Sequence, residues 1–142
     1  MTDLRMITPL TLDPVRIKSG FTTRLGGISL PPFDSLNLGT RTSDSAESVR
    51  ANYSLLYKYI NVEKKNTALM GQVHSAAIRI VDRGGLYNET DGILTATPGV
   101  LLGVRTADCV PLILHDPVRN VIGAVHCGWR PIVSEIVERS TE

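Results

Sequence analysis

Apolar residues recur along the chain mostly in short alternating or continuous runs, which is the pattern of β-strands. Val15, Ile17 and Phe21 alternate with more polar neighbours and predict a strand that leads into the glycine-containing turn 23–27. Six further runs, separated by Gly, Pro, Asn or Asp, predict strands at 67–73, 76–82, 92–97, 100–106, 110–114 and 121–126. Several of these runs are apolar at consecutive positions, so we expect strands that are covered on both faces.

Two segments show helical features instead. The first predicted helix begins near Asp44, whose side chain is expected to cap the free amides while Glu47 completes a capping box, and it ends by Asn61. Its apolar residues share one face that should lie on a sheet, at positions 49, 53, 56 and 60. A second helix is predicted after Trp129, because Pro131 suits the first turn of a helix, and it stops at the last residue.

The composition fits one soluble globular domain, so we expect residues 1–142 to form a single domain. The length of 142 residues is close to one typical domain, and 42% hydrophobic with 20% charged residues excludes a disordered tail. A formal net charge of +1 gives no electrostatic reason to expect nucleic acid or a membrane surface as a partner. Without a long apolar span or a secretory signal, we expect a cytoplasmic protein whose two cysteines are reduced.

Three residues with metal-ligating side chains stand beside the ends of predicted strands, namely His74, Cys109 and His126. Because neighbouring strands lie about 5 Å apart in a sheet, these residues can meet in space. One thiolate and two imidazoles suit zinc, and three protein ligands leave a fourth position open, as in catalytic zinc sites. The residues alone leave open an alternative in which Cys109 is a small buried apolar residue and His74 a hydrogen-bonded rim residue. Cys127 is expected to be structural, because successive side chains of a strand point to opposite faces.

Two further features bear on function. Arg24, beside the glycines of the turn 23–27, could present its guanidinium and free backbone amides to a phosphate or carboxylate, or be an ordinary surface arginine. The closing helix is too short to cover a sheet of five or six strands, which leaves an apolar face bare. We therefore expect the chain to be a fragment or to associate.

Six segments, taken together and in this order, resemble a known family. They lie at 20–29, 32–39, 72–74, 91–95, 107–112 and 126–130. The resemblance is to the laccase-domain family, also called the multicopper polyphenol oxidase, YfiH or peptidoglycan editing factor family. It implies an α+β fold with mixed β-sheets in an α/β/β/α layered sandwich. Family members are nearly twice as long, so the chain is expected to hold the N-terminal portion of the family domain, with the sandwich incomplete.

The resemblance also implies a site and an activity. It implies a metal site of His74, Cys109 and His126, holding zinc rather than copper, since a multicopper centre needs many histidines and the chain has 3. Family members are credited with phosphorolysis of purine nucleosides, adenosine deamination, hydrolysis in peptidoglycan precursor editing, and polyphenol oxidation. From residue type, Arg24 and Arg130 are expected to neutralise phosphate and Asn37 to orient it or the ribose.

Three functional hypotheses follow. The first is a zinc enzyme acting on purine nucleosides and phosphate, with Cys109 and His126 as catalytic residues. The second is a cysteine hydrolase in which Cys109 is the nucleophile and His126 its base, without metal. The third is a truncated remnant without activity, whose uncovered sheet face docks on another chain, including by self-association.

Overall fold

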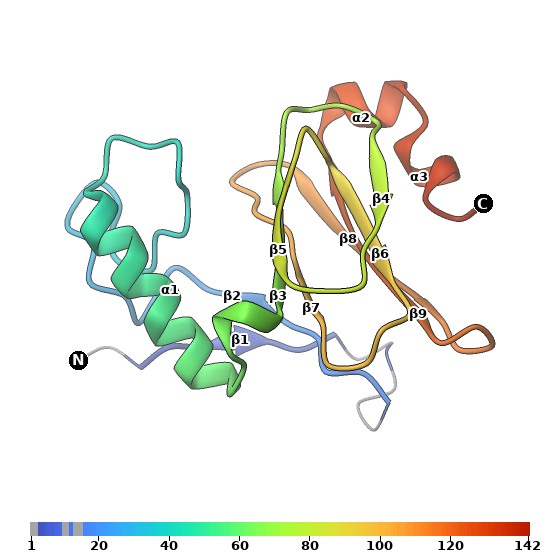
Figure 1. The fold of residues 1–142 in the computed structure, drawn as a ribbon. Helices are drawn as coiled ribbons and strands as arrows, with labels where there is room; N and C mark the ends of the chain where they lie inside the picture. Colours follow the sequence, from blue (N-terminus) through green and yellow to red (C-terminus); the bar gives the residue numbers. More distant parts are fainter. Residues whose placement is uncertain (1–2, 10–11, 13–15) are drawn as a thin grey trace. The chain divides into compact units, whose positions relative to one another are not determined.

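A computed structural model describes residues 3–9, 12 and 16–142 of the chain (Figure 1). The chain forms two compact units, Met1–Asn61 and Val62–Glu142, and each is described by itself.

The first unit begins with a very short antiparallel pair. Strand β1 (Met6–Ile7) pairs with β2 (Phe21–Thr22), with Ile7 opposite Phe21. The predicted strand over Val15, Ile17 and Phe21 is therefore largely wrong: Ile17 lies outside any strand, and Val15 lies outside the described residues. The physical reason is that a strand extends only as far as its partner, and β1 offers two residues.

Helix α1 (Ala46–Ile60) lies close to its predicted position but begins one residue later. Its N-cap is Ser45, whose side chain accepts hydrogen bonds from the amides of residues 47 and 48. Asp44 does not cap, because its carboxylate accepts hydrogen bonds from Ser29 and Asn37, and these bonds lower the pKa of Asp44. The helix ends as predicted, at Asn61 in the left-handed conformation.

Asn52, in the middle of α1, is a fully buried polar residue that organises the preceding loop. Its Nδ2 donates to Ser29 Oγ at 2.9 Å and to the carbonyl oxygens of Ser35 at 3.2 Å and Asn37 at 2.9 Å. Its Oδ1 accepts the amide of Ile28 at 2.8 Å. One side chain thus satisfies four groups of a loop that has no regular structure of its own.

The second unit contains two sheets. Its elements are the 3-10 helix η1 (Lys64–Asn66) and the strands β3 (Thr67–Gly71), β4 (Ile78–Ile80), β5 (Gly85–Asn88), β6 (Gly92–Thr95), β7 (Leu101–Gly103), β8 (Val110–Asp116) and β9 (Val121–Cys127). One sheet has the order β5-β3-β7 and is parallel, and the other has the order β4-β6-β9-β8 and is mixed. The six predicted strands are all present, four of them shorter than predicted. Strand β5 was not predicted, because glycines 84 and 85 look like a turn and most of the strand is exposed.

Two apolar clusters define the layers of this unit. One lies between the sheets, with residues of both in contact: Ala68, Met70, Val81, Ile93 and Ala124. The other lies on the opposite face of the four-stranded sheet, where Val125 and Cys127 pack with Ile136. The unit is therefore layered sheet, sheet and helix, with helix α3 (Ile136–Arg139) on the outside (Figure 1). The predicted α+β class with mixed sheets is confirmed.

The closing helix is broken, contrary to prediction. Helix α2 (Trp129–Val133), with Pro131 in its first turn as predicted, is separated from α3 by Glu135, whose backbone is left-handed at φ 62°. A left-handed residue cannot continue a right-handed helix, so α2 ends before Glu135 and α3 begins after it. Trp129, Ile132 and Val133 remain exposed on α2. Self-association through an uncovered apolar face stays a prediction.

None of the helices in the described part of the chain is long and apolar enough to cross a membrane.

We expect Asn52→Ala to destabilise the first unit by about 3 kcal/mol, because buried groups would be left without partners at a cost of about 1–3 kcal/mol each. Denaturant unfolding measures this change. Ser54→Ala is the matched control, since Ser54 is exposed on the same helix and its loss should cost at most about 0.5 kcal/mol. A loss below about 1 kcal/mol for Asn52→Ala would contradict the role given to this residue.

Candidate metal centre

The three predicted ligands come together in the second unit. One ligand atom from each of His74, Cys109 and His126 lies within 4.8 Å of the other two. His74 is exposed, Cys109 half-buried and His126 buried, so the cluster lies at the surface with one wall inside the protein. The two imidazole rings meet edge to face with centroids 4.8 Å apart.

Strand register brings Cys109 to His126. Strands β8 and β9 are antiparallel, and Pro111 lies opposite His126 while Val110 lies opposite Cys127. Cys109 directly precedes β8, so it stands at the sheet end where β9 finishes. The two residues are 17 positions apart in sequence and become neighbours through this hairpin.

Alternation along β9 decides which cysteine takes part. Val125 and Cys127 point to the cluster with Ile136, whereas Ala124 points to the cluster between the sheets. His126 shares the face of Ala124, because side chains two apart in a strand lie on one side. Cys127 is thereby directed away from the ligands, and burial raises the pKa of its thiol.

His74 follows β3 in a loop that wraps around a buried carboxylate. Its backbone is left-handed, with φ 59°, which is uncommon for a residue other than glycine. The amides of Val73, His74 and Ser75 donate to the carboxylate of Asp91 at 3.1, 3.0 and 2.8 Å. Successive amides around a left-handed residue form a concave anion site, often called a nest, and here the anion is a side chain of the protein.

Asp91 also contacts His126, the predicted ligand on the neighbouring strand β9. Its Oδ1 lies 2.8 Å from His126 Nδ1, and its carbonyl oxygen accepts the amide of His126 at 2.7 Å. Burial opposes ionisation of Asp91, but the hydrogen bonds from His126, Ser75 and Val73 outweigh it and lower the pKa of the carboxyl group. Asp91 is fully buried and belongs to the family segment 91–95, but the sequence alone does not indicate a role for it.

A second unpredicted contact ties together the loops before Cys109 and His74. Gln72 Nε2 donates to the carbonyl of Arg105 at 2.8 Å, and the amide of Arg105 donates to Gln72 Oε1 at 2.9 Å. The Arg105 guanidinium donates to the carbonyl of Met70 at 2.8 Å. These three hydrogen bonds fix the position of Arg105, from which the chain continues from β7 toward Cys109.

The donor set and the surrounding space fit a metal ion. Zinc takes one thiolate sulfur and two imidazole nitrogens with a fourth position open. Gly128 lies directly beside the ligands, because a Cβ atom there would come within 2.9 Å of His74 Nδ1 and 3.3 Å of Cys109 Sγ. Burial and the neighbouring Asp108 carboxylate raise the pKa of the Cys109 thiol, so a nearby cation is what would favour its thiolate.

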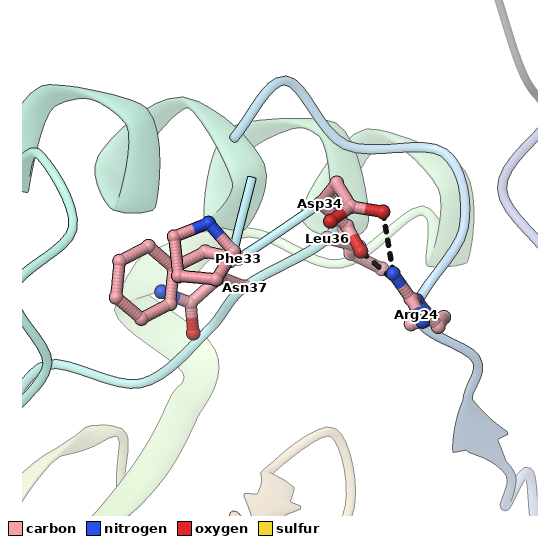
Figure 2. A pocket seen from close by; sticks show the side chains of 6 residues that line it. Arg24, Phe33, Asp34, Leu36 and Asn37 are labelled. Carbon is pink, nitrogen blue, oxygen red and sulfur yellow. Dashed lines mark hydrogen bonds and ion pairs between the residues drawn. The ribbon is translucent and has the colours of Figure 1, made fainter. Parts of the chain in front are cut away.

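The predicted anion-binding residues of the first unit already have partners. Arg24 forms an ion pair with the carboxylate of Asp34, and its Nε donates to the Asp34 carbonyl at 2.9 Å. In the same turn, the amides of Leu25 and Gly27 donate to the side chains of Thr23 and Ser35. Arg24 and Asp34 line an open pocket of about 280 Å³ together with Asn37 (Figure 2).

Asn37 and Arg130 are also held by neighbours. Asn37 Nδ2 donates to Asp44 at 2.9 Å, and its Oδ1 accepts the amide of Gly39 at 2.9 Å. In the second unit, the Arg130 guanidinium lies 5.1 Å from the centroid of the exposed Trp129 ring, which is a cation–π distance. Arg130 lies in helix α2, whose N-cap is Gly128.

We expect Gly128→Ala to weaken zinc binding about tenfold or more, because the added methyl group displaces His74. The backbone of Gly128, with φ −74° and ψ 168°, suits alanine, so the fold should persist. Competition with a chromophoric chelator measures the affinity, and the thermal midpoint serves as the control. Unchanged zinc affinity would show that the glycine is not needed at the centre.

Known proteins with similar sequences indicate the family of the chain. A family model described as multi-copper polyphenol oxidoreductase laccase matches residues 18–142. A Deinococcus radiodurans protein named purine nucleoside phosphorylase is 41% identical over 135 residues, covering 94% of this chain and 53% of the relative. Purine nucleoside phosphorylase YlmD of Bacillus subtilis is 36% identical over 128 residues, covering 83% of this chain and 46% of the relative.

Solved structures of similar proteins have the same fold over most of this chain. YlmD from Geobacillus stearothermophilus has a TM-score of 0.81 and 34% identity, over 84% of this chain and 48% of that one. A Neisseria meningitidis protein of the DUF152 family has a TM-score of 0.84 and 29% identity, over 96% of this chain and 55% of that one. The chain spans about half the length of the curated relatives it matches. It belongs to the multi-copper polyphenol oxidoreductase laccase family.

Proposed function

We propose that this chain carries the zinc centre of an enzyme that acts on purine nucleosides, with His74, Cys109 and His126 as the ligands. The observation that supports this most strongly is the approach of three ligand atoms to within 4.8 Å of one another. The names of the relatives supply the substrate class, since they are called purine nucleoside phosphorylases.

Zinc suits this ligand set better than copper. The chain has 3 histidines in all, and two of them are in the cluster, so a multicopper centre lacks ligands here. A bound zinc ion would act as a Lewis acid and would hold a reactant at its fourth position. We propose Cys109 and His126 as the catalytic residues because, with His74, they would hold the ion that supplies this chemistry.

Phosphorolysis also needs cationic groups. A phosphate oxygen forms a bond to C1′ of the ribose, the bond from C1′ to the purine breaks, and the proton of hydrogen phosphate passes to the base. Arg130 is exposed and lies two residues after Gly128, so we propose that its guanidinium neutralises the incoming phosphate. From residue type, we also propose that Arg24 binds phosphate and that Asn37 orients phosphate or ribose.

A cysteine hydrolase is the second candidate, and one observation favours it. Asp91, His126 and Cys109 stand in the order carboxylate, imidazole and thiol that activates a nucleophilic cysteine. Two features favour the metal instead. The pKa of the Cys109 thiol is raised, whereas a nucleophilic cysteine has a lowered one, and a hydrolase of this type has no use for His74 in the same cluster.

Metal analysis of matched cysteine variants tests the proposed function. We expect one zinc per chain and release of hypoxanthine from inosine with phosphate, and we expect Cys109→Ala to lose both. Cys127→Ala should keep both, because Cys127 points to the other face of β9. Adenosine in the same assay tests deamination as a second activity.

Two results would contradict the zinc proposal. The first is freshly purified chain without zinc that also takes up none when zinc is added. The second is alkylation of Cys109 that proceeds equally well with a chelator present, accompanied by hydrolase activity, and this result would favour the cysteine nucleophile.

We expect Asp34→Asn to lower the KM for phosphate about two- to fivefold, because the Asp34 carboxylate competes with phosphate for the Arg24 guanidinium. Steady-state phosphorolysis at varied phosphate concentration measures the change. Asp82→Asn is the matched control, since Asp82 forms an exposed pair with Arg83 at 3.9 Å. An unchanged KM for phosphate would contradict the proposal that Arg24 binds phosphate.

A further inference from the structure

The carboxylate of Asp91 contacts the segments of both proposed histidine ligands. Oδ1 accepts the amide of His74 at 3.0 Å and lies 2.8 Å from His126 Nδ1. Oδ2 accepts the amides of Val73 at 3.1 Å and Ser75 at 2.8 Å, and the Ser75 hydroxyl at 3.0 Å. Backbone amides can only donate, so both oxygens act as acceptors.

This acceptor role determines which nitrogen of His126 is available to a metal. An acceptor 2.8 Å from Nδ1 requires that Nδ1 carry the hydrogen, and a neutral imidazole then keeps its lone pair on Nε2. The ring is buried, with 3% of the residue exposed, so solvent cannot replace this partner. Asp91 therefore sets both the tautomer and the direction of the ring.

The same carboxylate fixes His74 through the backbone. A left-handed histidine is held only where its surroundings over-determine it, and here three consecutive amides converge on Asp91. Without the carboxylate, these amides would be left without their acceptor, and the loop would relax away from φ 59°. His74 would then leave its place beside Cys109.

We propose that Asp91 is the positioning residue of the centre, which sets the Nε2 lone pair of His126 and the loop of His74 toward one ion. The proposal rests on the proposed zinc site. It assigns to one carboxylate a joint effect on two ligands that come from different sheets.

Zinc affinity of Asp91→Asn tests this role. The amide keeps the size of the side chain but places an NH₂ group where an acceptor is needed, so we expect zinc affinity to fall about 10–100-fold in chelator competition. Asp116→Asn is the matched control, because Asp116 also accepts two backbone amides, at 2.8 and 3.0 Å, at the opposite end of β8. Asp116→Asn should bind zinc like the unaltered chain. Equal affinity for Asp91→Asn would overturn the proposal.

The tautomer of His126 in the zinc-free chain gives a second readout that needs neither activity nor a variant. Nitrogen-15 NMR of the imidazole should show the hydrogen on Nδ1 and an unprotonated Nε2. A hydrogen on Nε2 in the unaltered chain would overturn the proposal, even if Asp91→Asn fails to fold. If the unaltered chain binds no zinc, the proposed function fails, and the tautomer still decides the role of Asp91.

Discussion

The arrangement of His74, Cys109 and His126 depends on one buried negative charge, the carboxylate of Asp91, which is surrounded by hydrogen-bond donors. Asp91 is fully buried, and a carboxylate in that position is tolerable only when its oxygens are hydrogen-bonded. The amides of residues 73–75 and the ring of His126 meet that need. The donors stabilise the carboxylate, and the carboxylate in turn holds the donors in place. The loop 73–75 and strand β9 are thereby both fixed beside Asp91.

The rest of the second unit supports this arrangement with ordinary sheet geometry. The register of β8 and β9 carries Cys109 to the end of β9, and alternation along β9 separates His126 from Cys127. Gln72 and Arg105 fasten the two loops that approach the ligands from β3 and β7. The absence of a side chain at Gly128 leaves room beside His74 and Cys109. Each of these features affects the distances between the three side chains and the directions in which they point, and a bound metal ion requires specific values of both.

The sequence predicted the strands that have strong local signals, and continuous apolar runs indicated β8 and β9. Histidine and cysteine beside strand ends indicated three candidate ligands, and the structure brings these three residues together. It could not predict β5, whose glycines resemble a turn, or the break at Glu135, which depends on one left-handed residue. Asp91 was missed because its role depends on contacts 16 to 18 positions away in sequence and on a partner on another strand. Arg24 looked free because nothing local shows that Asp34 pairs with it.

X-ray absorption at the zinc edge, on the purified chain loaded with one equivalent of zinc, tests the central claim most directly. Convergence of His74, Cys109 and His126 on one ion predicts a single sulfur at about 2.3 Å and two imidazole nitrogens at about 2.0–2.1 Å. A coordination shell without sulfur, or one with two sulfurs that recruits Cys127, would contradict it.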